Sequence, residues 1–452
     1  MDNKTKIYEL GNKDIPKLLF QYSAPAIIAT SAASLYNIID RVFIGHGVGA
    51  LAISGLALTF PLMNIAAAFG AMVGVGASAM VSIRLGQNNK HEAILILGNA
   101  ISLNIIFGIS ISILGLIFLE PILCTLGASK DTLPYAKQFM EIILIGNMFT
   151  HLYLGLNNIM RASGYPFKAM ITTLITVAIN LTLAPIFIFL LKWGIRGAAL
   201  ATVTAQMMGT LYVIIHFLGK ENVLSITLSS MQLKFKTTRD ILSLGMSNFL
   251  MLLCSSVVLS FINLSLKKYG DDHTIGAFGI ISGIMGLAVM IVIGFNQGMQ
   301  PIVGYNFGAR QISRVLQAFK LTVLAATTIT SISFLVAELF PWSIAKAFTN
   351  DDALINMTVS GLRLSFLMFP IVGFQIVTSN FFQSTGKSKI SIFLSLTRQV
   401  LLLIPALIIL PRFLGLNGVW LSLPASDFSS ALLTYSLLQW QLKKLKAGEI
   451  NM

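Results

Sequence analysis

Charged residues are scarce in this sequence, and acidic residues are scarcer than basic ones. Only 11% of the 452 residues are charged, with 17 Asp and Glu against 31 Lys and Arg. About a quarter of the residues in a typical soluble domain are charged, so this composition excludes an ordinary soluble protein. The net charge of +14 could suggest nucleic-acid binding, but the positions of the basic residues, described below, assign it to membrane topology.

Cysteine, histidine clusters and nucleotide-binding motifs are also lacking. The two cysteines, Cys124 and Cys254, lie far apart in apolar stretches, which excludes a disulfide framework and a cysteine metal site. The five histidines are scattered, and we find neither a P-loop nor a nucleophile motif. We therefore expect no enzymatic activity and no cofactor, and any transport would draw its energy from an ion gradient. No removable signal peptide is expected at the N-terminus.

Long apolar runs occupy most of the chain. No charged residue falls between Glu92 and Glu120, between Lys168 and Lys192, or between Asp240 and Lys267. Each run exceeds the roughly 20 residues that a helix needs to cross a bilayer. We predict an all-α polytopic membrane protein with twelve spans, at roughly 15–43, 51–81, 93–119, 133–158, 168–191, 196–218, 239–266, 275–303, 317–341, 356–381, 390–411 and 416–440.

Basic residues collect on one side of these spans. The side of the spans that holds both termini, the linker after the sixth span and the loops in between carries 20 of the 31 Lys and Arg. Short loops rich in Lys and Arg stay in the cytoplasm, so we expect both termini to be cytoplasmic. The positive charge is thus explained by topology, and nucleic acid is not an expected partner.

Three short motifs recur along the chain at a nearly constant offset of about 222 residues. The pairs are Asn158–Gly164 with Asn380–Gly386, Gly194–Gly197 with Gly415–Gly418, and Arg84–Gly86 with Asn306–Gly308. Because each pair falls in equivalent predicted loops, the repeat indicates that the chain consists of two related halves.

The repeat divides the chain into an N-terminal six-helix lobe (residues 1–218), a cytoplasmic linker (219–238) and a C-terminal six-helix lobe (239–452). An even number of spans in each half makes the repeats parallel, related by an axis along the membrane normal. Two facing bundles are typical of a transporter that works by alternating access.

Asp40 is an acid near the end of the first predicted span. On a helix, Asn37 lies one turn before it and Tyr36 four residues before it, so the three lie close together on the helix surface. An ionisable side chain at membrane depth indicates a functional site. The alternative is a simple ion pair between Asp40 and Arg41 at the outer headgroup boundary.

Polar residues of the fifth and sixth spans fall at a depth similar to that of Asp40. These are Asn180, Thr202 and Gln206. Together with Asp40 they offer carboxylate, amide and hydroxyl oxygens, which suit a proton or a small hard cation such as Na⁺. For Asn180 and Thr202, ordinary hydrogen bonding between helices explains their presence equally well.

Two further acids fall inside predicted spans. Glu141 follows Lys137 by one helical turn, and this spacing favours an interfacial salt bridge over a coupling role. Asp427 falls near the middle of the last span. It is either a second functional acid or the structural partner of Arg398 or Arg363.

Several longer motifs resemble the multidrug and toxic compound extrusion (MATE) family, in particular its MepA-like bacterial branch. The resemblance covers nearly the whole chain and is most specific in the longest motif, residues 294–308. The motifs that carry it are Tyr36–Gly45, Asn158–Gly164, Asn180–Phe187, Gly197–Thr202 and Gly294–Gly308.

The resemblance implies a V-shaped pair of six-helix lobes. It also implies that cationic or amphipathic drugs, or toxic organic cations, leave the cell in exchange for H⁺ or Na⁺. The family's coupling residues match Asp40, Asn180 and Thr202 here, and Asn157 is a weaker match at a less suitable depth. The resemblance to a bacterial branch implies a location in the bacterial plasma (inner) membrane. We expect a monomer whose partners are small molecules and the lipid bilayer.

The chain departs from the family pattern at Ala184, where the family usually has an acid one turn after the Asn of the fifth span. Losing this acid removes a like charge beside Asp40 and an oxygen ligand for sodium, and these two effects act oppositely on the choice of ion. We hypothesise that Asp40 alone carries coupling, with Glu141 as a possible substitute acid.

Other readings remain open at this stage. A lipid-linked oligosaccharide flippase of the wider superfamily would have a cationic cavity and often 14 spans, whereas only Arg363 and Arg398 are available here for such a cavity. The duplicated halves and the lone buried acid argue against a channel or another non-coupled membrane protein.

Overall fold

The computed structural model describes residues 3–219 and 222–446, and helices account for nearly all of them. The first half forms α1 (Asn3–Asn12), α2 (Ile15–Gly47), α3 (Ala50–Gly86), α4 (Lys90–Ile117), α5 (Leu119–Thr125), α6 (Leu133–Ala162), α7 (Pro166–Pro185), the π-helical turn η1 (Ile186–Leu190) and α8 (Gly194–Leu218). The second half forms the 3₁₀ turn η2 (Leu228–Met231), α9 (Phe235–Tyr269), α10 (Asp272–Gly308), α11 (Ile312–Leu339), α12 (Pro341–Phe348), α13 (Asp352–Phe366), α14 (Phe369–Ser384), α15 (Ser388–Leu396), the π-helical segment η3 (Thr397–Leu403) and α16 (Ile404–Lys446).

Most of these helices are long and apolar enough to cross a membrane. Within the described ranges ten helices meet that condition, and counting the bent pair α13–α14 as one more span makes eleven. The predicted all-α polytopic membrane protein is therefore confirmed. The helices extend beyond the predicted spans, as α3 does from Ala50 to Gly86, because hydropathy marks only the part that lies in hydrocarbon.

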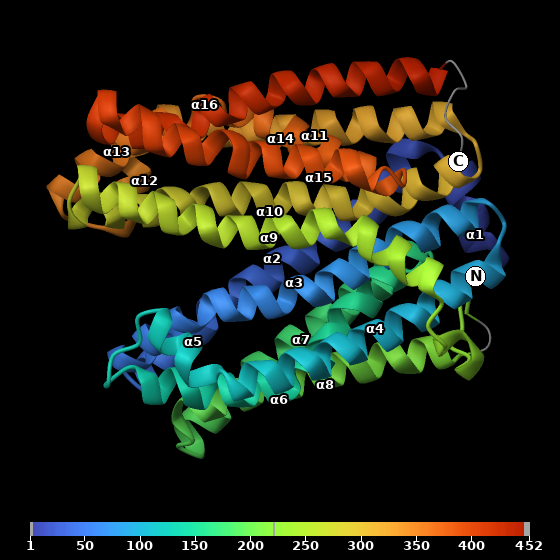
Figure 1. Ribbon diagram of the computed structural model, residues 1–452, viewed down its shortest axis with the longest axis horizontal. Helices are drawn as coiled ribbons and strands as arrows, with labels where there is room; N and C mark the ends of the chain where they lie inside the picture. Colours follow the sequence, from blue (N-terminus) through green and yellow to red (C-terminus); the bar gives the residue numbers. More distant parts are fainter. Residues whose placement is uncertain (1–2, 220–221, 447–452) are drawn as a thin grey trace.

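The long helices run roughly side by side in two groups (Figure 1). Helices α3 to α8 lie mainly in one group and α9 to α16 in the other, while α2 runs between them. Helix α3 packs against α9 and α10, and α2 packs against α7 and α10. Helix α1 and the end of α16 lie at one end of the molecule, called here the terminal end, and α5 and α12 lie at the opposite, far end.

The contacts between α3 and α10 follow the sequence repeat. Gln300 Nε2 donates to Ser78 Oγ at 3.0 Å, and these two positions are 222 residues apart. A methyl group on Gly86 would lie 1.9 Å from the carbonyl oxygen of Tyr305, and one on Gly308 would lie 2.1 Å from that of Ile83. Since the same offset relates Gly86 to Gly308 and Ile83 to Tyr305, the two glycine contacts are equivalent under the repeat.

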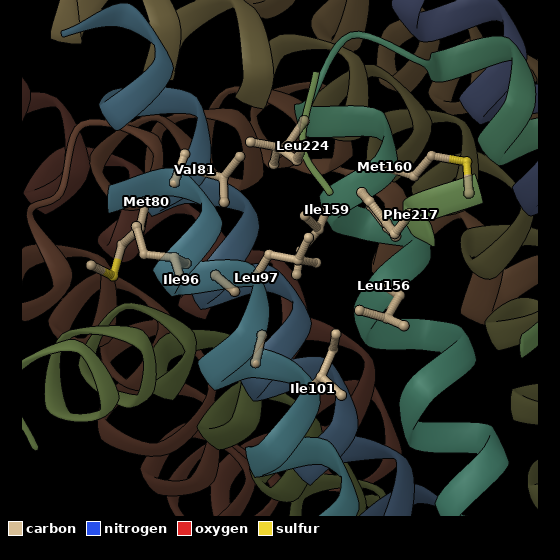
Figure 2. Packing of buried hydrophobic residues seen from close by; sticks show 14 of the residues in the cluster. Met80, Val81, Ile96, Leu97, Ile101, Leu156, Ile159, Met160, Phe217 and Leu224 are labelled. Carbon is tan, nitrogen blue, oxygen red and sulfur yellow. The ribbon is translucent and has the colours of Figure 1, made fainter. Parts of the chain in front are cut away.

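The link between the two halves is docked against the first half. Leu224 belongs to an apolar cluster formed by residues of α3, α4, α6 and α8, among them Leu97 of α4 and Phe217 of α8 (Figure 2). The Asn99 side-chain amide of α4 donates to the carbonyl oxygens of Ser230 at 3.2 Å and Gln232 at 3.1 Å. These contacts fix the chain between α8 and α9 at the terminal end.

Candidate functional site

Asp40 is a buried acid on α2. The residue is only 8% exposed, and its Oδ1 has no hydrogen-bond partner among the described residues. The Arg41 guanidinium lies over the ring of Phe60, 4.4 Å from the ring centroid. No ion pair between Asp40 and Arg41 is found in the described part of the chain, so the predicted alternative of a simple pair is not realised.

Three other predicted residues are linked to one another, and one of them, Tyr36, interacts with Asp40. The Asn180 Nδ2 of α7 donates to Thr202 Oγ1 of α8 at 3.1 Å, and Thr202 Oγ1 donates to the Ala198 carbonyl at 3.1 Å. The Tyr36 hydroxyl interacts with the Thr202 side chain, and Tyr36 also lies close enough to Asp40 for their charges to interact. The interhelical bond expected as the alternative for Asn180 and Thr202 is thus present.

Two acceptor oxygens in this region receive no hydrogen bond from the described residues. Asn180 is 2% exposed, and its Oδ1 has no partner among the described residues, like the Oδ1 of Asp40. A buried acceptor without a donor costs about 1–3 kcal/mol. Each of these two oxygens is therefore an acceptor that a proton or a cation could satisfy.

Two of the predicted residues stand apart from this group. Asn37 is exposed, and its Nδ2 donates to the Ala33 carbonyl at 2.9 Å. Gln206 on α8 accepts a hydrogen bond from Thr150 of α6 through its Oε1. Within the described part of the chain, neither side chain is hydrogen-bonded to Asp40, Asn180 or Thr202.

Asn157 belongs to a second polar group, two members of which the sequence reasoning missed. Asn157 Nδ2 donates to Thr173 Oγ1 at 3.2 Å, and the Tyr153 hydroxyl donates to the same oxygen at 3.1 Å. Tyr153 lies one turn before Asn157 on α6, which was the available signal for it. Tyr153 also interacts electrostatically with Tyr36, so the two groups are neighbours.

The surroundings of Ala184 and Glu141 differ from what the sequence suggested. Ala184 is fully buried in an apolar cluster that includes Ile44 of α2 and Met140 of α6. Lys137 Nζ forms its ion pair with Glu120 Oε2 of α5 at 2.9 Å. The predicted salt bridge between Lys137 and Glu141 is therefore wrong, because α5 brings a closer carboxylate to the lysine.

Asp427 has the structural partner that was one of its alternatives. Arg398 Nε donates to Asp427 Oδ1 at 2.8 Å, and Ser426 Oγ donates to the Arg398 carbonyl at 2.9 Å. Arg363 instead forms an ion pair with Glu338, with 3.8 Å between Arg363 Nε and Glu338 Oε1. Within the described residues, no group of three or more His, Cys, Asp or Glu could hold a metal ion.

Sequence comparison matches most of this chain to one family of membrane transporters. Residues 25–186 and 244–408 match the sequence model of the MatE family. The multidrug export protein MepA of Staphylococcus haemolyticus is 27% identical over 436 residues, which cover 96% of each chain. MepA of Staphylococcus aureus strain MRSA252 is 26% identical over 427 residues, 94% of each chain.

Solved structures share the fold over nearly the full length. A multidrug resistance MATE family transporter of the MOP superfamily, in an outward-facing conformation, superimposes with a TM-score of 0.91 and 25% identity, covering 97% of this chain and 98% of that one. A MATE structure in a bent conformation gives a TM-score of 0.92 at 24% identity, with 98% of both chains covered.

Proposed function

This chain belongs to the MatE family, and we propose that it is a secondary active antiporter that exports cationic or amphipathic compounds in exchange for H⁺ or Na⁺. The observation that carries the proposal is the buried Asp40 carboxylate, whose Oδ1 lacks a donor among the described residues. A carboxylate in that state has the chemistry to take up a proton or a cation and release it again. The likeness to multidrug export proteins supports small organic molecules as the cargo.

Twelve crossings in two six-helix lobes are the architecture that we propose. The stretch Ser388–Lys443 is 56 residues long, roughly twice what one crossing needs at about 1.5 Å per residue. Its backbone breaks at Gly415, where φ is 55°, and division there gives two spans. The proposed lobes are residues 1–218 and 239–452, joined by the linker 219–238. The repeat-related contacts between α3 and α10 support them.

The terminal end is proposed to face the cytoplasm of a bacterial cell. The basic residues gather there, as the positive-inside rule requires. The contacts of Gly86 and Gly308 close the molecule at this end, so the state described here would open toward the outside. Alternation with an inward-open state would complete the transport cycle, and one chain holds both lobes, so a monomer suffices.

The coupling site is proposed to consist of Asp40, Asn180 and Thr202, with Tyr36 beside them. A proton needs only the carboxylate, whereas Na⁺ needs several oxygens around it. Ala184 adds no oxygen and lies in an apolar cluster, which favours H⁺. Asn157 and Gln206 line the same lobe and are proposed to contact cargo.

Efflux from proteoliposomes tests the proposal when the two ion gradients are imposed separately. We expect ethidium to leave against its gradient when a proton gradient alone is imposed, and the rate to saturate with substrate. Flux that does not saturate would identify a channel. Flux that no ion gradient can drive uphill would refute antiport.

A further inference from the structure

A groove with one arginine lies at the far end of α2 and α3. Six residues line its volume of about 550 Å³, namely Ile38, Arg41, Val42, Gly45, His46 and Ile53. Four of them are aliphatic or glycine, so the groove is apolar apart from Arg41 and His46. None of these residues belongs to the group around Asp40.

The periodicity of α2 shows which way this groove faces. Ser23 and Ile27 meet α10, where methyl groups on Gly298 and Gly294 would lie within 3.0 Å of them. Arg41 and Gly45 each follow one of these residues by 18 positions, which is about five turns of 3.6 residues. Arg41 and Gly45 therefore lie on the face of α2 that is turned toward α10.

At the level of the groove, α2 and α10 have separated. Gly283 lies about three turns before Gly294 and on nearly the same face of α10. A methyl group on Gly283 or on Gly279 would meet no atom within 4 Å. The groove thus opens into the space between the two halves, at its far end.

Arg41 has no direct ion-pair partner among the described residues. The neighbouring Asp40 interacts with its charge electrostatically, but the Asp40 carboxylate is buried, whereas Arg41 is exposed. Helix α3 contains no acid. The turn between α9 and α10 contains two lysines, Lys267 and Lys268, and two aspartates, so the charges of this turn sum to zero. The guanidinium lies over the Phe60 ring, and because Arg41 is exposed, its N–H groups are available for an anion.

We propose that this groove is a specificity site for amphiphiles that carry a negatively charged group, which bind with that group at Arg41 and their apolar part along Ile38, Val42 and Ile53. This inference rests on the proposed export function and extends its cargo beyond cations. An aromatic sulfonate matches the groove in charge and in apolar area. The apolar lining alone would accept an uncharged analogue equally well, so Arg41 supplies the discrimination.

Two dyes that differ by one sulfonate test this site. They are 8-anilinonaphthalene-1-sulfonate and N-phenyl-1-naphthylamine, titrated against the purified chain in phosphatidylcholine nanodiscs, with empty nanodiscs as the blank. We expect Arg41→Gln to weaken binding of the sulfonate about fivefold, as loss of one exposed charge pair does, and to leave the uncharged dye unchanged. Arg412→Gln is the matched control, since Arg412 is exposed and lies outside the groove; it should change neither affinity.

Three outcomes would overturn the inference. The first is unchanged binding of the sulfonate in Arg41→Gln, and the second is equal weakening of both dyes. The third is loss of sulfonate binding by the unmodified chain when phosphatidylglycerol is added, because this would identify a lipid as the occupant of the groove. Ethidium efflux in proteoliposomes is measured on the same preparations. Efflux without Arg41-dependent sulfonate binding removes this inference alone, whereas Arg41-dependent binding without any efflux removes the proposed function.

Discussion

At the scale of single residues, Asp40 differs from Asp427, the other buried acid within a predicted span, because its Oδ1 has no partner among the described residues. Asp427 accepts a hydrogen bond from Arg398 at 2.8 Å, whereas the Asp40 Oδ1 accepts none from the described residues. A paired carboxylate is held in its charged form by its partner, while an unpaired one can exchange a proton or a cation. This difference supports the proposal that Asp40 carries coupling, whereas the ion pair gives Asp427 a structural role.

Replacing Asp40 with Asn should abolish uphill ethidium efflux in proteoliposomes. The amide of Asn has nearly the same shape as the carboxyl group of Asp, but it does not ionise at physiological pH and so can neither take up nor release a proton. Efflux is measured under an imposed proton gradient, with Glu120→Gln as the control, because Glu120 is an exposed acid at the far end. Uphill efflux at the unmodified rate in Asp40→Asn would exclude coupling at this residue.

Glu141 has a separate test in the same assay. If Glu141 substitutes for the acid missing at Ala184, Glu141→Gln should reduce gradient-driven efflux at least tenfold, as expected for loss of a group needed in every cycle. An unchanged rate would remove Glu141 from the coupling site and leave Asp40 as the sole acid.

At the scale of helices, the pairing of Arg398 with Asp427 joins η3 to α16. The single change Asp427→Asn should lower the free energy of unfolding by about 3–5 kcal/mol, because it leaves a partly buried guanidinium without its carboxylate. Replacing both residues, as in Arg398→Met with Asp427→Leu, should recover most of that loss. Thermal unfolding in detergent measures both variants, and a double variant less stable than the single one would contradict a purely structural pair.

The glycine contacts between α3 and α10 give a second prediction for helices. Gly86→Val and Gly308→Val should each cost more than the ~1–3 kcal/mol of ordinary overpacking, since the added carbon would meet backbone that cannot yield. The two losses should be similar, because the repeat makes the positions equivalent. Gly279→Ala is the control and should be tolerated, because a methyl group there meets nothing within 4 Å. Very unequal effects in the melting temperature would contradict the equivalence.

The sequence predicted helices better than it predicted partners. Charge-free runs are a property of single segments, so the spans could be located, although the short α5 escaped notice. The pairing of Lys137 was assigned wrongly because Glu120 reaches it from that short helix. Likewise, the contact of Arg41 with Phe60 was not predicted, since it depends on how α2 and α3 are packed. Spacing along one helix reveals neighbours on that helix only. Asn180 and Thr202 could be grouped across two helices because they fall at a similar depth in their spans, and the family motifs also mark both.

At the scale of the whole molecule, the proposed orientation makes the two ends chemically distinct. Helix α5 lies at the far end (Figure 1), and its Cys124 is exposed. With cytoplasmic termini, Cys124 would face the outside of the cell, while the half-buried Cys254 lies within the membrane-spanning part of α9. The native cysteines therefore report the orientation without any added label.

A membrane-impermeant maleimide should label the unmodified protein in intact cells, and Cys124→Ser should remove that labelling while Cys254→Ser retains it. Adding Lys90→Cys to the Cys124→Ser variant places a thiol at the exposed start of α4, at the opposite end from α5. That thiol should react only after the cells are permeabilised. Because both sites lie on the same chain at opposite ends, the reverse labelling pattern would mean that the molecule has the opposite orientation in the membrane. It would then place the groove at Arg41 on the cytoplasmic side, where it would act on cargo entering the transporter instead of cargo leaving it.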